Sequence, residues 1–169
     1  MANYIRYANK EDAGTLALIN SDSFKQAFTG IIPEEFINLK FSYESLKERF
    51  YKELDEGITT NCIMYKDDVP VGMLTFMKDD YKEREESEID LGRLYLLSEY
   101  WRQKLGMEFI NWGIKEVKAR GYKKVALWVV EENLRARRFY EKAGFMHNGE
   151  IRTIKPGREI KEYRYTKDL

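Results

Sequence analysis

Apolar and polar positions change their period several times along the chain, and these changes predict the first elements of secondary structure. Residues 4–8 (YIRYA) alternate as a half-buried strand does, whereas residues 10–28 place apolar side chains at helical spacing. Residues 31–40 predict a loop or a short helix. Residues 42–57 begin with serine, a favoured helix start, and end with glycine, so a second helix is expected there.

The same patterns continue to the end of the sequence, where strands become more frequent. We expect a hairpin at 61–78, a charged loop at 79–87, a strand at 89–97, a helix at 107–121, a strand at 123–130, a helix at 133–143 and two strands at 145–154 and 159–167. The hairpin turn is predicted at the Asp67–Asp68 pair, between two apolar runs.

This order of elements predicts an α/β fold of the α+β type, a mixed β-sheet with helices on both faces. A single domain over residues 1–169 accommodates every element, because no linker, repeat or low-complexity segment interrupts the chain. Residues 89–130 form a βαβ unit within it. Gly92, inside a strand pattern, indicates a bulge or a close backbone approach, so the central strand is expected to be bulged.

Composition removes several classes of function. The 29 basic and 29 acidic residues leave no net charge, so neither nucleic acid nor a membrane is expected as a partner. Cys62 is the only cysteine and His147 the only histidine, which disfavours disulfides, metal clusters and Ser-His-Asp catalysis. We expect no metal. The beginning of the sequence lacks the basic and apolar regions of a signal peptide, and the expected location is the cytoplasm.

Asn133 and Tyr140 stand seven residues apart, so a helix over 133–143 places them on one stripe with small and basic side chains between them. Such a face suits a ligand. An ordinary structural interpretation is also available, because Asn133 is a good N-cap and Gly144 a good residue to follow a helix.

The segment SEYWRQKLGM (98–107) joins a strand to a helix and offers backbone amides at a helix start, where phosphate binds. Arg102 and Lys104 add positive charge there. The sequence contains neither GxxxxGK[ST] nor GxGxxG, so a P-loop NTPase or a Rossmann dinucleotide enzyme is disfavoured.

The segments LYLLSEYWRQKLG (94–106) and NLRARRFYEKAGF (133–145), joined by a strand at βαβ spacing, together resemble the GNAT superfamily of N-acetyltransferases. The resemblance covers residues 86–146, and the order of elements extends it loosely to the whole chain. It implies acetyl-CoA as cosubstrate. The family's loop pattern of Gln or Arg, Gly, and Gly or Ala falls here on Trp101, Lys104 and Gly106, so only its last position is kept.

The resemblance also implies a role for each residue of the cofactor half. Leu94 and Leu96 would offer main-chain hydrogen bonds to the pantetheine arm, which Asn133 would also contact. Tyr140 would lie at the thioester sulfur and protonate the leaving thiolate as a general acid. The pyrophosphate loop would consist of Trp101, Arg102, Gln103, Lys104, Leu105, Gly106 and Met107. A lysine at position 104 could pair with a phosphate through its side chain, so weakened or rearranged cofactor binding is expected.

A base is needed to remove a proton from the attacking amine. Asp90 matches the position where some members of the family carry a basic glutamate, and period-two alternation places it on the face of Leu94 and Leu96. The alternatives are a solvated edge carboxylate at this position and a water chain as the base.

The expected reaction is direct attack of a primary amine on acetyl-CoA, the acceptor being a small molecule or a peptide or protein N-terminus. Acceptor choice is predicted from the N-terminal helices and the hairpins, at residues 23–36 and 151–160. A cationic amine such as a polyamine or aminoglycoside would suit the aromatic and acidic residues of the N-terminal region: Phe24, Phe28, Glu34, Glu35, Phe36 and Tyr43. A non-catalytic CoA-sensing or protein-interaction domain is the alternative function. Arg135, Arg137 and Arg138 point in different directions around their helix, which indicates a solvated face rather than a nucleic-acid patch, and the aromatic-rich surface is compatible with a homodimer.

Overall fold

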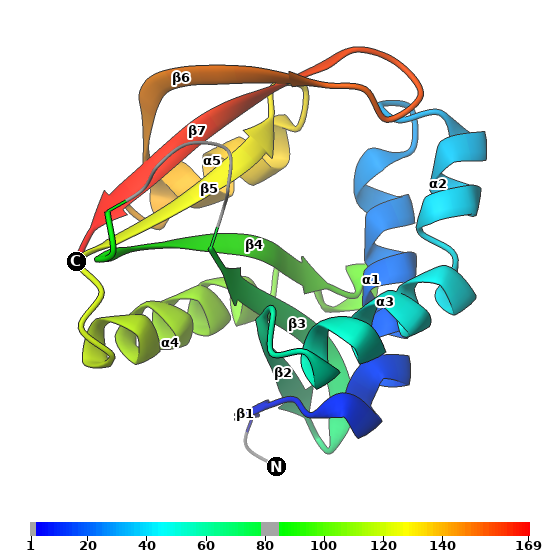
Figure 1. Cartoon of the computed structure of the whole chain (residues 1–169), viewed down its shortest axis with the longest axis horizontal. Coiled ribbons are helices and arrows are strands. Elements are labelled where there is room, and N and C mark those ends of the chain that lie inside the picture. Colours follow the sequence, from blue (N-terminus) through cyan, green and yellow to red (C-terminus); the bar gives the residue numbers. More distant parts are fainter. Residues whose placement is uncertain (1–2, 79–84) are drawn as a thin grey trace.

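The computed structural model describes residues 3–78 and 85–169. The strands are β1 (Tyr4–Tyr7), β2 (Thr60–Lys66), β3 (Val69–Met77), β4 (Glu88–Leu96), β5 (Lys124–Val130), β6 (Met146–Ile154) and β7 (Ile160–Asp168). The helices are α1 (Ala13–Phe28), α2 (Glu34–Lys40), α3 (Tyr43–Asp55), α4 (Leu105–Ala119) and α5 (Leu134–Lys142), with short 3-10 turns η1 (Lys10–Asp12) and η2 (Ser98–Tyr100). The strands form one seven-stranded sheet in the order β1-β2-β3-β4-β5-β7-β6 (Figure 1).

The predicted mixed sheet with helices on both faces is confirmed. Every strand pair is antiparallel except β4 and β5, which the crossover helix α4 joins in parallel as expected for a βαβ unit. Segment 31–40 contains the short helix α2, and α4 begins at Leu105 rather than at Met107. The predicted charged loop lies largely in residues 79–84, outside the described part of the chain. Within residues 3–78 and 85–169, no helix combines the length and apolar character needed to cross a bilayer.

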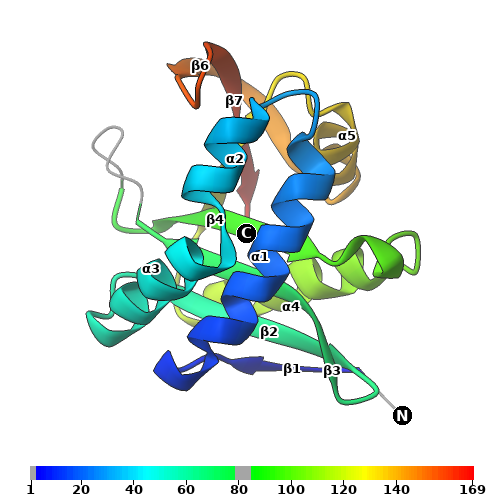
Figure 2. The ribbon, with the colours of Figure 1, turned by 90° about the vertical axis from the view of Figure 1, so that its right-hand side faces the viewer.

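The helices divide between the two faces of the sheet because side chains alternate along each strand. On β2, Cys62 and Met64 point into a core shared with α4 and α5, whereas Ile63 points into a core shared with α1 and α3. A smaller cluster joins α1 and α2 to the end of β5 through Phe24 and Val130. Figure 2 shows α1, α2 and α3 in front of the sheet with α4 and α5 behind it.

The middle of the sheet opens between β4 and β5. The two strands pair only from Glu88, opposite Lys124, to Asp90, opposite Ala126, although both continue further. The register between β3 and β4 shifts between Thr75 and Phe76, directly opposite Gly92, which places the expected bulge in the central strand. Beyond this bulge, β4 diverges from β5 and leaves one backbone edge without a neighbouring strand. The opening positions the candidate site.

Candidate active site

Two cavities meet where the strands diverge. The inner cavity, of about 450 Å³, lies between the ends of β4 and β5 and extends below α1 and α2. The outer cavity, of about 670 Å³, lies between the end of β4, the start of α4 and the helix α5. Six residues line both cavities: Leu94, Leu96, Trp101, Arg135, Ala136 and Tyr140. The predicted strand and helix segments are therefore brought together at one junction.

Asn133 and Tyr140 are held by the two ends of α5. The Asn133 side chain accepts a hydrogen bond from the Ala136 amide at 3.2 Å, so the N-cap expected from the sequence is present. At the other end, Gly144 has φ +94°, and Phe145 N donates to the Tyr140 carbonyl at 3.0 Å, as in a Schellman motif. Asn133 nevertheless lines the inner cavity, so the capping and ligand-binding interpretations are compatible.

Tyr140 lines both cavities. The ring makes edge contacts with Phe139 and Phe145, at centroid distances of 5.3 and 5.8 Å. Burial raises the pKa of the Tyr140 phenol, and the nearby Tyr95 raises it further. The phenol therefore stays protonated at neutral pH, which is the form that a general acid requires.

The outer cavity is basic. No acidic side chain is among the described residues that line it, and five cationic side chains are: Arg102, Lys104, Arg135, Arg138 and Lys142. Gly106 and Met107 contribute to the same wall. Lys104, the residue before α4, adopts φ +63° and ψ +3°, the left-handed conformation in which glycine is favoured. The loop thus has a glycine-like backbone at this position in spite of its lysine.

Trp101 covers part of the free edge of β4. Its indole Nε1 donates to the Leu96 carbonyl at 2.9 Å, and the Arg135 guanidinium lies 3.3 Å from the centroid of its ring. Burial lowers the pKa of Arg135, and the nearby Arg102 lowers it further. The Leu96 carbonyl, predicted to bind a pantetheine arm, is therefore already paired with a side chain.

Two residues of the predicted cofactor loop lie outside both cavities. Gln103 accepts a hydrogen bond from Lys66 and donates to the Glu99 carbonyl at 3.2 Å, which turns its side chain away. The Leu105 side chain is buried in the core beneath α4, because it begins the apolar face of this helix. These two side chains therefore do not line the cavities, and only the main chain of Gln103 and Leu105 could take part in the predicted loop.

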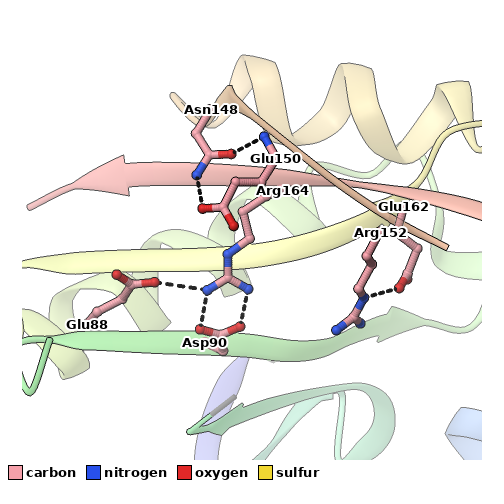
Figure 3. Close-up of polar contacts among 7 residues, drawn as sticks. All are labelled: Glu88, Asp90, Asn148, Glu150, Arg152, Glu162 and Arg164. Carbon is pink, nitrogen blue, oxygen red and sulfur yellow. Dashed lines mark hydrogen bonds and ion pairs between the residues drawn. The ribbon is translucent and has the colours of Figure 1, made fainter. Parts of the chain in front are cut away.

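Asp90 does not meet the expectation for a base facing the cofactor. Its carboxylate accepts two hydrogen bonds from the fully buried Arg164, at 2.6 and 2.8 Å, and Arg164 also donates to Glu88 (Figure 3). Asp90 lines neither cavity. Alternation along β4 failed as a guide because the bulge at Gly92 breaks the period between Asp90 and Leu94.

The carboxylate that lines the inner cavity belongs instead to Glu162 on β7. Arg152 donates to its Oε1 at 2.7 Å from the neighbouring strand β6 (Figure 3). Burial raises the pKa of Tyr95 to about 12; Arg93 opposes this shift, whereas Glu162 adds to it. Tyr95 and Glu162 thus line the inner cavity together with Tyr140.

Sequence reasoning missed Glu162, although one signal was available. Ile160, Glu162 and Arg164 stand two residues apart and share one side of β7, where Ile160 and Arg164 are buried. Charged residues on the same side of a strand as a buried isoleucine indicate polar side chains that point into the fold. A search for such positions would have identified Glu162 as a candidate.

The predicted acceptor residues separate into two groups. Phe24, Phe28 and Phe36 line the inner cavity. The side chains of Glu34, Glu35 and Tyr43 are exposed and do not line it. The inner cavity therefore has the expected aromatic character but no acidic wall from α2.

The sequence profile of the Acetyltransferase (GNAT) family matches residues 24–145, from the end of α1 through α5. The match covers more than half of the 169 residues. The chain therefore belongs to the Acetyltransferase (GNAT) family, a family of acyltransferase enzymes.

Individual relatives agree with this assignment. The chain is 28% identical over 149 residues to a spermidine N(1)-acetyltransferase of Thermoplasma acidophilum, covering 86% of this chain and 89% of that protein. It is 27% identical over 154 residues to a probable N-acetyltransferase of Mycobacterium tuberculosis, covering 90% and 84%. The crystal structure of the PaiA N-acetyltransferase from Thermoplasma acidophilum in complex with coenzyme A has a TM-score of 0.77 and 24% identity, and the similarity covers 100% of both chains.

Proposed function

We propose that this protein transfers the acetyl group of acetyl-CoA to a primary amine of a small molecule or peptide by direct attack. One observation carries the proposal: the basic outer cavity and the aromatic inner cavity meet at Tyr140, in the opening between β4 and β5. A cosubstrate bound from one side and an amine entering from the other would bring their reacting atoms together there.

The outer cavity fits CoA in both charge and form. Arg102, Lys104 and Arg138 are suited to the phosphates, and amides at the start of α4 add donors. The free edge of β4 at Leu94 is suited to the amide groups of a pantetheine arm. The Leu96 carbonyl oxygen already accepts one hydrogen bond from Trp101, so the arm would use its second lone pair.

Acetyl-CoA supplies the reactive thioester. The amine nitrogen forms a bond to the acyl carbon, and the carbon–sulfur bond breaks. Tyr140 donates its phenolic proton to the leaving thiolate, while free amides of β4 stabilise the charge on the carbonyl oxygen. Glu162, oriented by Arg152, is suited to hold the amine and accept its proton, directly or through water.

The nature of the acceptor has partial support from the relatives. The spermidine N(1)-acetyltransferase named above makes a polyamine one candidate. The aromatic side chains of the inner cavity would equally suit other amines with an apolar body. Peptide N-termini belong to the same chemical class and are part of the proposal.

Calorimetric titration with CoA, acetyl-CoA and NAD tests the cofactor half of the proposal. We expect binding of both CoA forms and none of NAD, and Lys118→Gln, an exposed substitution on α4 outside the cavity, as a control with unchanged affinity. Release of CoA thiol in the presence of an amine panel, with acetylated product identified by mass, tests the chemistry. CoA binding without transfer to any amine would instead favour the non-catalytic alternative.

A further inference from the structure

The inner cavity has a second polar end, away from Tyr140. Lys40, the last residue of α2, and Arg49 of α3 line the cavity there. Arg49 donates to the Lys40 carbonyl at 3.2 Å, and its guanidinium lies 5.6 Å from the centroid of the Phe41 ring. These contacts hold a cation in place at the end of the cavity rather than leaving it free to extend into solvent.

An aromatic wall connects the two ends. The Tyr95 ring lies 6.4 Å from the Phe24 ring in an edge contact, and Phe24 stacks on Phe41 at 3.6 Å with an interplanar angle of 7°. Phe41 in turn contacts Arg49. The reacting end and the cationic end are therefore separated by two stacked rings, a surface that suits an apolar chain or ring of a ligand.

The charges of the inner cavity are unequal along this wall. Glu162, the one acidic residue among the described lining residues, is paired with Arg152. Arg93 is paired with Glu53 at 2.8 Å. The side chains of Lys40 and Arg49 have no carboxylate partner within residues 3–78 and 85–169. Arg135 has none in these residues either, but it lies over the Trp101 ring, where the inner cavity meets the outer one. The end opposite Tyr140 is therefore cationic.

We propose that the acceptor is a primary amine that also carries an anionic group, a carboxylate or a phosphate, at the far end of an apolar body. The amine lies at Glu162 and Tyr140, the body lies along Phe24 and Phe41, and Lys40 and Arg49 bind the anion. This assignment rests on the proposed acetyltransferase function and specifies its substrate class. A polyamine would instead place a second ammonium group beside Lys40 and Arg49, where like charges repel.

Matched acceptors test the proposal in the wild-type enzyme. Hexylamine, 6-aminohexanoate and 6-aminohexyl phosphate share one amine and one apolar chain and differ in the terminal group, and spermidine adds further ammonium groups. We expect kcat/KM for at least one anionic acceptor to exceed that for hexylamine by about tenfold or more, mainly through KM. The ratio between the two anionic acceptors distinguishes a carboxylate site from a phosphate site. A preference for spermidine or hexylamine over both would overturn the proposal.

Charge variants test which residues carry the preference. Lys40→Gln with Arg49→Gln is expected to remove the advantage of the anionic acceptor and to leave kcat/KM for hexylamine within about twofold. Arg49→Lys keeps the charge and should retain most of the advantage. Lys47→Gln, on α3 but outside the cavity, is the control. An advantage that persists in the double variant would exclude Lys40 and Arg49 as the anion site.

Failure of the proposed function would be recognised separately. A protein that neither binds CoA nor acetylates any amine fails as an acetyltransferase, and the assignment of its acceptor fails with it. A protein that binds CoA and acetylates hexylamine or spermidine better than the anionic acceptors is an acetyltransferase for which only the substrate class is wrong. Thermal melting of each variant shows whether a loss of activity reflects unfolding.

Discussion

Arg164 reaches across strand β5 and donates two hydrogen bonds to Asp90, one to each carboxylate oxygen. The ion pair is buried, and Asp90 is the last residue of β4 that is in register with β5. The ion pair thus ties β7 to β4 at the point from which the two inner strands diverge. Its position suggests that it supports the opening rather than taking part in catalysis.

Asp90→Asn should therefore affect stability. We expect the free energy of unfolding to fall by about 3 kcal/mol, the lower end for a broken buried ion pair, since Glu88 remains near Arg164. The double variant Asp90→Asn with Arg164→Met should recover part of this loss, because no buried cation remains. Urea denaturation measures both. Wild-type stability of Asp90→Asn together with a lost acidic limb in the pH profile would restore Asp90 as the base.

Tyr140→Phe should affect turnover and leave folding unchanged. Its hydroxyl has no hydrogen-bond partner among the described residues, so the melting temperature should not fall, whereas kcat should decrease by about 100-fold or more. Because the pKa of the phenol is raised, the wild-type enzyme should not lose activity through Tyr140 between neutral pH and pH about 10. Tyr51→Phe, at an exposed position of α3, provides the control. Equal kcat values for Tyr140→Phe and wild type would exclude the general acid.

Two substitutions distinguish the effect of the left-handed backbone conformation at Lys104 from the effect of its side-chain charge. Lys104→Gly relieves the left-handed conformation and should raise the free energy of unfolding by about 1 kcal/mol, while Lys104→Gln should leave it almost unchanged. Both variants lose the side-chain charge, so both should bind CoA several-fold more weakly, with a smaller dependence on salt. If the glutamine variant binds CoA as tightly as wild type, the side-chain charge contributes little to affinity.

Cys62 should be unreactive in the folded protein. Its thiol is buried on β2, and this burial raises its pKa to about 12, so the reactive thiolate is scarce at pH 8. A disulfide reagent such as DTNB should label no thiol before denaturant is added and one thiol per chain afterwards. Rapid labelling of the native protein would contradict the buried position. The same property allows DTNB to report CoA release during catalysis.

Local features of the chain were well predicted. The N-cap at Asn133 and the glycine end of α5 at Gly144 depend on a few neighbouring residues, and both are present. The Asp67–Asp68 turn of the first hairpin is also present, with both residues at positive φ. The bulge expected from Gly92 is confirmed by the register shift opposite it. Each of these features follows from backbone chemistry within a few residues.

The assignment of charged side chains was less successful. Asp90 was expected to face the cofactor, but it is paired with Arg164, 74 residues away in sequence. Glu162 was not expected at the site at all. Neither arrangement can be read from local periodicity, because each depends on which strands become neighbours and on the bulge that changes the orientation of β4.

The sequence by itself determined the elements, their order, the mixed sheet and the family motifs, because hydrophobic period and helix ends are local properties. Only the tertiary structure decided which carboxylate lines the cavity, that Trp101 binds the Leu96 carbonyl, and that Lys40 and Arg49 meet the same aromatic wall. These relationships arise when distant segments pack together. Burial and the available partners then determine whether a charge supports the fold or remains available to a ligand.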